Sequence, residues 1–336
     1  MARRFFWWWM QTETLFASWG RAWPELPLRG KFKKTPEDFV VTELAAHPAS
    51  DDLPEASKHL YLFLQKRNQT TRELARALAD ANDLPISSIG YAGMKDKHAV
   101  TQQWLSIPLD ESGLNGKEPS IPVGAHELQR SMQAKKLRRG WHTGNRFEIV
   151  LRELSCALDP SELEARLVLV REQGVPNYFG AQRFGADNLT QAINWLPRRR
   201  RERDAFKRGL HLSVLRSFLF NKVLAARVAD QSWASVADGP LWGRGRPVVE
   251  EATAAFERAA LGEDAFIAEE LEFAGLRQER RALRLLPQPL SWEFLENDAL
   301  RLEFVLPPGA YATAVLRELG QQSSAPPAGN LCGSVA

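Results

Sequence analysis

The segment GYAGMKDKHAVTQQW, residues 90–104, combines a glycine-punctuated turn, one acid among three bases, and a strand-like run. Its acid, Asp96, is the only carboxylate between Asp83 and Asp110. Neighbouring positive charge favours the charged form of a carboxyl group, and an ionised carboxylate can attack a sugar carbon or take up a proton. Asp96 is therefore a candidate catalytic residue, although a solvated surface turn has the same local pattern.

The composition is typical of a globular protein. The chain has 336 residues, enough for two domains of about 150 residues each, and it is 44% hydrophobic and 25% charged. No apolar run approaches the roughly 18 residues that a membrane span requires. Neither the two cysteines nor the six histidines have the spacing of a metal site. We therefore expect no metal, no membrane span and a reducing, cytoplasmic setting.

The basic residues are concentrated in two clusters, although the net charge is only +3. One cluster contains Lys135, Lys136, Arg138 and Arg139, and the other contains Arg198, Arg199, Arg200, Arg201, Arg203, Lys207 and Arg208. Each cluster alone is equally compatible with a solvated helix face. Two such clusters in a weakly charged chain favour a polyanionic partner, in particular a nucleic acid.

Hydrophobic periodicity predicts strands and helices without a regular strand–helix–strand rhythm. Strands are predicted near residues 39–41, 59–64, 104–107, 126–133, 145–154 and 300–306, and helices near 70–81, 160–172, 214–229, 250–261 and 313–319. Residues 191–208 are predicted to combine a short helix with the arginine run. Thr70 or Thr71 is the expected N-cap of the first helix, and Ser161 that of the second. The pattern indicates a mixed α+β sheet rather than a doubly wound parallel one.

A second unusual segment is NYFGAQRFG, residues 177–185, which places three aromatic residues, two amides and one arginine between glycines. An exposed Phe can stack on a flipped base, and an Asn can read a base edge. An aromatic-rich core loop is the alternative interpretation. The chain lacks the glycine-rich phosphate-binding motifs, so the use of a nucleoside triphosphate or a dinucleotide is not expected.

From about Lys31 to Leu319, the chain resembles the TruD family of tRNA pseudouridine synthases. The resemblance rests on six motifs in the family's order, and together they are very specific. They are Pro36-Glu37-Asp38-Phe39, the segment from Ala92 to Thr101, Gly144-Asn145-Arg146-Phe147, the segment from Asn177 to Gly185, the segment from Arg216 to Asn221, and Ala310-Tyr311-Ala312-Thr313.

This resemblance implies a pseudouridine synthase fold, that is, an α+β fold with a mixed, largely antiparallel sheet flanked by helices and an inserted second α/β domain. The implied organisation is a catalytic domain at 23–199 and 286–320 with the insert at 200–285. Two segments depart from the family, and from their residues we expect an N-terminal extension at 1–22 and a disordered tail at 321–336. The implied activity is the isomerisation of uridine to pseudouridine in tRNA, at tRNA position 13. The resemblance implies no cofactor and no metal, tRNA as the partner, no protein partner, and a monomeric protein.

The resemblance also implies roles for single residues. Asp96 matches the catalytic aspartate, Lys33 is the candidate charge partner for it, and Phe39 and Asn177 match residues that contact substrate. Phe179 is the stacking aromatic, and Tyr311 stands where the family often has Phe, so that stacking is expected to survive. The candidates for contact with the RNA backbone are Lys95, Lys97, Arg183, Arg198, Arg199, Arg200 and Arg201. Lys95 and Lys97 need not touch the Asp96 carboxylate, because neighbours in an extended chain point to opposite faces.

Two other functions stay open from the residues themselves. An RNA-binding protein or tRNA chaperone could keep the fold without catalysis, although the intact Asp96 loop argues against it. A nucleoside or glycoside hydrolase would need a second carboxylate near the first, and no paired acid stands out. The sequence also does not choose among sugar attack, ring attack and elimination to a glycal.

Overall fold

The computed structural model describes residues 16, 18–45, 58–110, 113–155, 159–185, 187–197, 204–245 and 249–324. The chain forms two compact units. The sheet unit comprises residues 26–163, 287–309 and 320–336, and the helical unit comprises 1–25, 164–286 and 310–319. Helix α3, Pro160–Gln173, begins in the sheet unit and ends in the helical unit.

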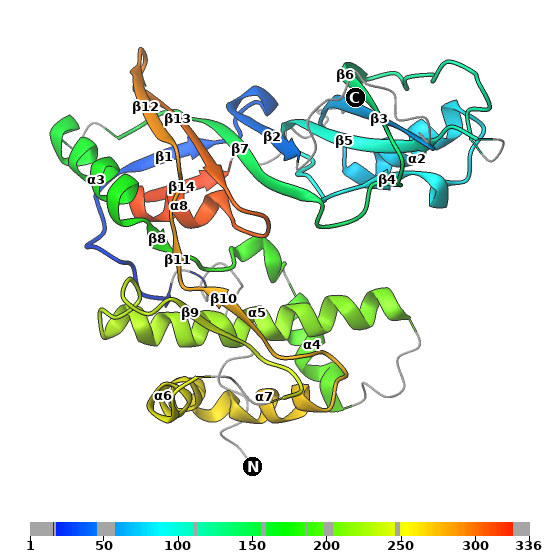
Figure 1. Cartoon of the computed structure of the whole chain (residues 1–336). Helices are drawn as coiled ribbons and strands as arrows, with labels where there is room; N and C mark the ends of the chain where they lie inside the picture. Colours follow the sequence, from blue (N-terminus) through cyan, green and yellow to red (C-terminus); the bar gives the residue numbers. More distant parts are fainter. Residues whose placement is uncertain are drawn as a thin grey trace, which may run out of the picture. The chain divides into compact units, whose positions relative to one another are not determined.

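Within the described residues, the sheet unit is built on an eight-stranded sheet (Figure 1). The strand order is β12-β13-β7-β2-β5-β3-β6, with β4 paired to β5. The strands are β2 Phe39–Ala45, β3 His59–Arg67, β4 Gly90–Tyr91, β5 Val100–Pro108, β6 Ala125–Gln133, β7 His142–Leu151, β12 Leu290–Leu295 and β13 Ala299–Leu306. All neighbours are antiparallel except β2 and β5. The predicted mixed, largely antiparallel sheet is therefore confirmed.

Strand alternation gives β3 two different faces. Leu60, Leu62 and Leu64 are buried against α2, Thr71–Ala81, in one apolar core, whereas Tyr61 and Phe63 belong to the opposite face, because successive side chains of a strand point to opposite sides. The Thr70 hydroxyl accepts a hydrogen bond from the Glu73 N–H and completes a capping box. The predicted N-cap at Thr70 is confirmed.

Two expectations about chain segments were wrong. The carboxylate of Asp159 accepts a hydrogen bond from the Ser161 N–H at 2.9 Å. Asp159, the residue before α3, therefore caps the first turn of this helix in place of Ser161. The start of the tail is also ordered, since β14, Gln321–Ser324, pairs in parallel with β1, Arg29–Phe32. Backbone N–H and C=O groups can pair without any apolar pattern, and residues 325–336 lie outside the described residues.

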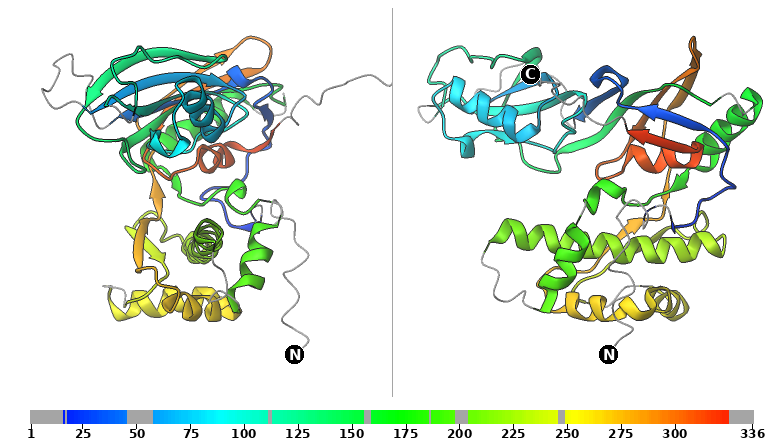
Figure 2. Two further views of the ribbon diagram at one scale, coloured as in Figure 1. Left: turned by 90° about the vertical axis from the view of Figure 1, so that its right-hand side faces the viewer. Right: turned by 180° about the vertical axis from the view of Figure 1, so that it is seen from behind.

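The helical unit is organised around α5, Ala205–Ala229, a helix of 25 residues. Figure 2 shows α5 end-on in its left view, with α6 and α7 in yellow below it. The other elements are α4 Asn188–Trp195, α6 Glu251–Leu261, α7 Ala265–Glu272, α8 Ala312–Leu319, the antiparallel pair β9 Asp238–Leu241 and β10 Glu279–Ala282, and the pair β8 Val175–Pro176 and β11 Arg284–Leu285. The apolar residues of α5 are buried in the core of this unit, among them Leu215, Phe218, Leu219, Val223 and Leu224.

The units differ from the predicted domain limits. Residues 164–197 and 310–319 belong to the same unit as the segment predicted as an insert, 200–285. Hydrophobic periodicity shows that a helix has an apolar face, but it does not show which core that face joins. The domain limits given by the resemblance therefore stay a prediction.

The end of the predicted N-terminal extension contributes to the helical unit. Trp19 is buried and stacks on Tyr178 with ring centroids 5.7 Å apart, and the Tyr178 hydroxyl donates to the Gly20 carbonyl at 3.1 Å. Residues 1–15 and 17 lie outside the described residues. Of the helices that the structure describes, none has the length and apolar content needed to cross a bilayer.

We expect Leu62→Ala to lower the free energy of unfolding by about 2–5 kcal/mol, because it leaves a cavity in the core beneath α2. The matched control is Leu128→Ala, since Leu128 is 48% exposed, and its effect should stay within about 0.5 kcal/mol. Urea denaturation followed by circular dichroism measures both. Equal effects of the two substitutions would contradict the assigned faces of the sheet.

Candidate active site

The loop that carries Asp96 joins β4 to β5 and is held through its backbone. The buried Lys66 ammonium, on β3, donates to the Asp96 carbonyl at 3.0 Å and also to the Gln69 carbonyl. The Lys95 N–H donates to the Thr71 hydroxyl at the start of α2 at 2.8 Å. The loop is thus fixed on both sides of the candidate catalytic residue by regular elements, which is how a precise site is built.

The Asp96 carboxylate is accessible and lies beside a cation. Its side chain is 40% exposed, and its Oδ2 atom is 3.6 Å from the Lys33 Nζ atom. The same Nζ atom lies 4.0 Å from the centre of the Phe39 ring. Lys33, Phe39 and Asp96, which the sequence analysis grouped by function, therefore lie together in the sheet unit.

Lys33 itself has an unusual backbone conformation. Its φ of 59° lies in the left-handed region, which non-glycine residues adopt infrequently. It directly follows β1 and precedes the short helix η1, Pro36–Asp38. A sparsely populated conformation at a residue that faces the candidate carboxylate supports a functional rather than an incidental placement.

The Pro-Glu-Asp-Phe motif and the Gly-Asn-Arg-Phe motif meet behind this group. The buried Asp38 carboxylate accepts from the Thr35 N–H at 3.0 Å and from the Arg152 guanidinium at 2.8 Å, which fixes η1 before Phe39. The Phe147 ring contacts both the Phe39 ring, at 6.0 Å, and the Phe304 ring, at 5.6 Å. The Phe39 ring, which lies beside Lys33, therefore packs against a row of aromatic rings.

The two lysines that flank Asp96 have different environments. The buried Lys95 ammonium lies 2.6 Å from a carboxylate oxygen of Glu43 and 2.8 Å from the Asn145 amide oxygen. This burial argues against the RNA-backbone role predicted for Lys95. Lys97 is exposed and 3.9 Å from Glu73, so the role predicted for it stays open.

In the helical unit, the segment from Asn177 to Gly185 forms a second cluster. The Arg281 guanidinium carbon lies 4.1 Å from the Phe179 ring centre, and its Nη2 atom donates to the Asn177 side-chain oxygen at 2.6 Å. The Asn177 amide nitrogen donates to the Ala282 carbonyl at 2.8 Å. Burial lowers the pKa of Arg281 to about 10. The cation covers one face of the Phe179 ring, and Phe179 is 7% exposed and belongs to the apolar core of this unit.

Tyr311 and Asn221 complete this cluster. The Tyr311 ring lies 5.9 Å from the Phe179 ring in an edge arrangement. The Asn221 side chain both accepts from the Phe179 N–H and donates to the Phe179 carbonyl, each at 2.9 Å. A Cβ at Gly180 would lie 2.5 Å from the Thr313 hydroxyl, so only glycine allows the loop to approach α8 this closely. Three of the six sequence motifs therefore meet in the helical unit.

The remaining predicted residues are placed as follows. Arg183 is half-buried, with its guanidinium carbon 5.7 Å from the Phe179 ring and 5.9 Å from the Tyr311 ring. Arg198, Arg199, Arg200 and Arg201 lie outside the described residues. Among the residues that are described, no group of three His, Cys, Asp or Glu side chains could hold a metal ion.

Three residues that support these clusters were not predicted from the sequence: Glu43, Lys66 and Arg281. A signal for Lys66 was present, because it continues the inward series of alternate residues Leu60, Leu62 and Leu64 on β3, where a charge needs a partner. No comparable signal marks Arg281, which stands next to another arginine on a short strand. Glu43 also lies at an inward position, two residues beyond Val41.

Comparisons with known proteins identify the family of the chain. The sequence model of the family described as tRNA pseudouridine synthase D (TruD) matches residues 22–194 and 234–319. The chain belongs to the TruD family. It is 43% identical over 314 residues to the tRNA pseudouridine synthase D of Cellvibrio japonicus, a match that covers 89% of this chain and 91% of that protein. The corresponding protein of Pseudomonas syringae pv. syringae is 38% identical over 338 residues, covering 89% and 93%.

The fold agrees as well. A crystal structure of a Methanosarcina mazei protein assigned to tRNA pseudouridine synthase D matches with a TM-score of 0.64 and 20% identity, covering 89% of this chain and 95% of that one. At this identity the likeness concerns the fold alone. The resemblance and the pseudouridine synthase fold that the sequence analysis predicted are both confirmed.

The buried Lys66 generates a prediction about pH. Burial lowers its pKa from 10.5 to about 8, so between these pH values the unfolded chain binds a proton that the folded chain has released. Lys66 therefore makes the folded state more stable as the pH rises through this range. Between pH 8 and 10, the free energy of unfolding of the wild type minus that of Lys66→Met should rise by on the order of 2 kcal/mol.

Urea denaturation at a series of pH values measures this difference. The control is Lys117→Met, because Lys117 is exposed and its curve should stay parallel to that of the wild type. A constant difference between the wild type and Lys66→Met from pH 6 to pH 10 would show that Lys66 titrates normally.

Proposed function

We propose that this protein isomerises uridine to pseudouridine in tRNA, with Asp96 as the catalytic carboxylate. The observation that carries the proposal is the accessible Asp96 carboxylate, fixed by its backbone and placed 3.6 Å from Lys33, in a chain of the TruD family. The two relatives described above carry the name tRNA pseudouridine synthase D. We further propose that the target is the uridine at tRNA position 13, as the resemblance implies.

The reaction rearranges the substrate without adding or removing an atom. The bond from C1′ of ribose to N1 of uracil breaks, the base turns over, and C1′ bonds to C5. The proton leaves C5, and N1 gains one. A carboxylate can bond to the ribose carbon, attack the ring, or remove a sugar proton to form a glycal, and it can later accept the C5 proton. Asp96 fits each of these routes, because its oxygen atoms are accessible on one side.

Lys33 is proposed to act as the charge partner of Asp96. The ammonium group lies 3.6 Å from a carboxylate oxygen, a distance at which opposite charges attract. Since the same ammonium lies over the Phe39 ring, it is held near the carboxylate by two attractions. Phe39 is proposed as a substrate contact, as the resemblance implies.

In the helical unit, Asn177, Phe179 and Tyr311 are proposed to contact the substrate nucleotide. Removing a base from its stack costs a few kcal/mol, and stacking on an aromatic ring recovers roughly 1–3 kcal/mol per base. Arg183 and Lys97 are proposed to bind RNA phosphates, together with Arg198, Arg199, Arg200 and Arg201. The monomeric state and the cytoplasmic location remain predictions as well.

Asp96→Asn should lower the rate of pseudouridine formation by on the order of a thousandfold or more, because the amide cannot act as nucleophile or base. Tritium release from tRNA labelled at C5 of uridine measures the rate, and filter binding should show unchanged tRNA affinity. The control is Asp80→Asn, since Asp80 is exposed on α2. Wild-type turnover by Asp96→Asn would remove Asp96 from the mechanism.

Assays of the wild-type protein distinguish the synthase from the RNA-binding protein and the hydrolase. Tight tRNA binding without pseudouridine would favour the non-catalytic RNA-binding protein, and release of free uracil would favour a hydrolase. Chemical mapping of pseudouridine in tRNA from cells with and without this protein identifies the position. Loss of pseudouridine at another position only would contradict the assignment of position 13.

Tyr311 allows a matched pair of substitutions. Tyr311→Phe keeps the ring that packs against Phe179 and should keep the activity within about twofold, whereas Tyr311→Ala should lower kcat/KM about 5- to 150-fold, corresponding to the stacking range. Equal losses in both variants would assign the role to the hydroxyl rather than to the ring. Thermal unfolding of both variants controls for folding.

A further inference from the structure

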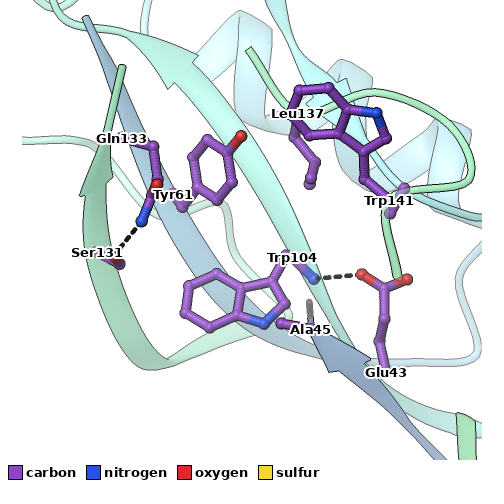
Figure 3. A pocket seen from close by; sticks show the side chains of 9 residues that line it. Glu43, Ala45, Tyr61, Trp104, Ser131, Gln133, Leu137 and Trp141 are labelled. Atoms are coloured by element: carbon purple, nitrogen blue, oxygen red, sulfur yellow. Dashed lines mark hydrogen bonds between the residues drawn. The ribbon is translucent and has the colours of Figure 1, made fainter. Parts of the chain in front are cut away.

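The Glu43 carboxylate, on β2, lies where the backbone pairing of β2 with β5 ends. The parallel pairing of these two strands stops at Thr42 and Gln102, whereas β2 pairs with β7 along its whole length. Beyond this last pair, a Glu43 carboxylate oxygen accepts from the Trp104 N–H at 3.2 Å, a bond that Figure 3 marks with a dashed line. A side chain thus links β2 to β5 beyond the end of their backbone pairing.

The Lys95 side chain, from the loop that carries Asp96, lies in the same place. Its Nζ atom is 2.6 Å from a Glu43 carboxylate oxygen and 2.8 Å from the Asn145 amide oxygen, and the Lys95 and Glu43 side chains are 4% and 1% exposed. Asn145 is the residue of β7 that pairs with Glu43 across the sheet. One ammonium group therefore connects the loop to β2 and β7, and through Glu43 to β5.

The surroundings of this ammonium group restrict its position. A Cβ atom at Gly93 would lie 3.2 Å from the Lys95 Nζ atom and 3.3 Å from the His142 Cε1 atom, so the loop backbone passes close to both groups. A buried ammonium group also has to keep its bonds, because an unpaired charge in the interior is costly. Lys95 therefore holds the loop where its two partners place it.

Asp96 follows Lys95 directly, and its backbone is held on both sides. The Lys95 N–H donates to the Thr71 hydroxyl, and the Lys66 ammonium donates to the Asp96 carbonyl. The Asp96 side chain is 40% exposed, with its Oδ2 atom 3.6 Å from the Lys33 Nζ atom. Because consecutive Cα atoms are only about 3.8 Å apart, a shift of Lys95 would move the Asp96 carboxylate as well.

We propose that Glu43 is a positioning residue of the reaction. Through the Lys95 ammonium group, it holds the Asp96 carboxylate where that group reacts with the target nucleotide, and Glu43 itself does not touch the nucleotide. The inference rests on the proposed function, because it requires Asp96 to be the catalytic carboxylate. A displacement of about 1 Å at a reacting group can cost on the order of a hundredfold in rate, so Glu43 should affect turnover rather than tRNA binding.

The alternative is that the ion pair only stabilises the fold. Removing one member of a buried pair leaves the other charge unpaired and is strongly destabilising, whereas replacing both members by hydrophobic residues of similar volume is often neutral for stability. A single and a double substitution therefore separate the two roles. Stability should recover in the double variant, but the directed bonds of the ammonium group should not.

Glu43→Gln should lower kcat about 10- to 100-fold and leave KM for tRNA within about threefold of the wild-type value. In Glu43→Gln/Lys95→Met neither charge remains, and the Gln oxygen can still accept from the Trp104 N–H. The thermal unfolding midpoint of this double variant should lie within about 4 °C of that of the wild type, whereas its kcat should stay about tenfold or more below. Tritium release from tRNA labelled at C5 of uridine measures kcat and KM.

The matched control is Asp264→Asn in the helical unit. Asp264 is a half-buried carboxylate that pairs with the Lys222 ammonium group, so this substitution also leaves an ammonium group without its carboxylate. The unfolding midpoint should fall, whereas kcat should stay within about twofold of the wild-type value.

Crystal structures of the wild type and of Glu43→Gln test the geometry without turnover. The distance from the Asp96 Oδ2 atom to the Lys33 Nζ atom, 3.6 Å in the structure described above, should differ between the two crystals by about 1 Å or more. An unchanged distance would contradict the positioning role.

The outcomes distinguish the two proposals. If the wild type forms no pseudouridine, the proposed function fails and the positioning role fails with it. If the wild type forms pseudouridine and the double variant turns over tRNA at the wild-type rate, only the positioning role is overturned. Losses of kcat in Glu43→Gln and Asp264→Asn that both follow the loss of stability would also overturn it. If Glu43→Gln does not fold, the double variant still decides.

Discussion

The buried ion pair between Lys95 and Glu43 is the constraint on which the loop that carries Asp96 depends. Taking two charges out of water is costly, and the cost is offset only when both charges are paired and hydrogen-bonded. Here Asn145 provides the additional bond to the ammonium, so β2, β7 and the loop are joined at one point. The Lys95 ammonium keeps both partners in one geometry only. This fixes the direction in which the side chain of the next residue, Asp96, points.

The two lysines that hold the loop act in complementary ways. Lys95 ties its side chain to the sheet, whereas Lys66 reaches from β3 to the backbone carbonyl of Asp96. Neither ammonium pairs with the carboxylate oxygens of Asp96, and the nearby Lys33 is a separate, partly exposed cation. Lys95 and Lys66 thus hold the loop, whereas Lys33 supplies the nearby positive charge. The Asp96 oxygens therefore stay accessible.

The sequence predicted the sheet type, most of the elements, the N-cap at Thr70 and the grouping of Lys33 with Asp96. The elements and the N-cap depend on local patterns, whereas the largely antiparallel sheet and the grouping of Lys33 with Asp96 came from the resemblance to the TruD family. It could not predict that Lys95 is buried, because a lysine in a glycine-rich turn looks solvated until Glu43 and Asn145 are brought to it from other strands. The pairing of β14 with β1 was missed for a similar reason, since the polar residues 321–324 carry no strand pattern.

The pairing of β1 with β14 also bears on protein synthesis. β1 directly precedes Lys33, whereas its parallel partner β14 follows β13, the last strand of the eight-stranded sheet, and so leaves the ribosome after that sheet has been made. A nascent chain that already contains Asp96 therefore still lacks the strand that fixes the approach to Lys33. The backbone next to Lys33 gains its strand partner only after residue 324 has been synthesised.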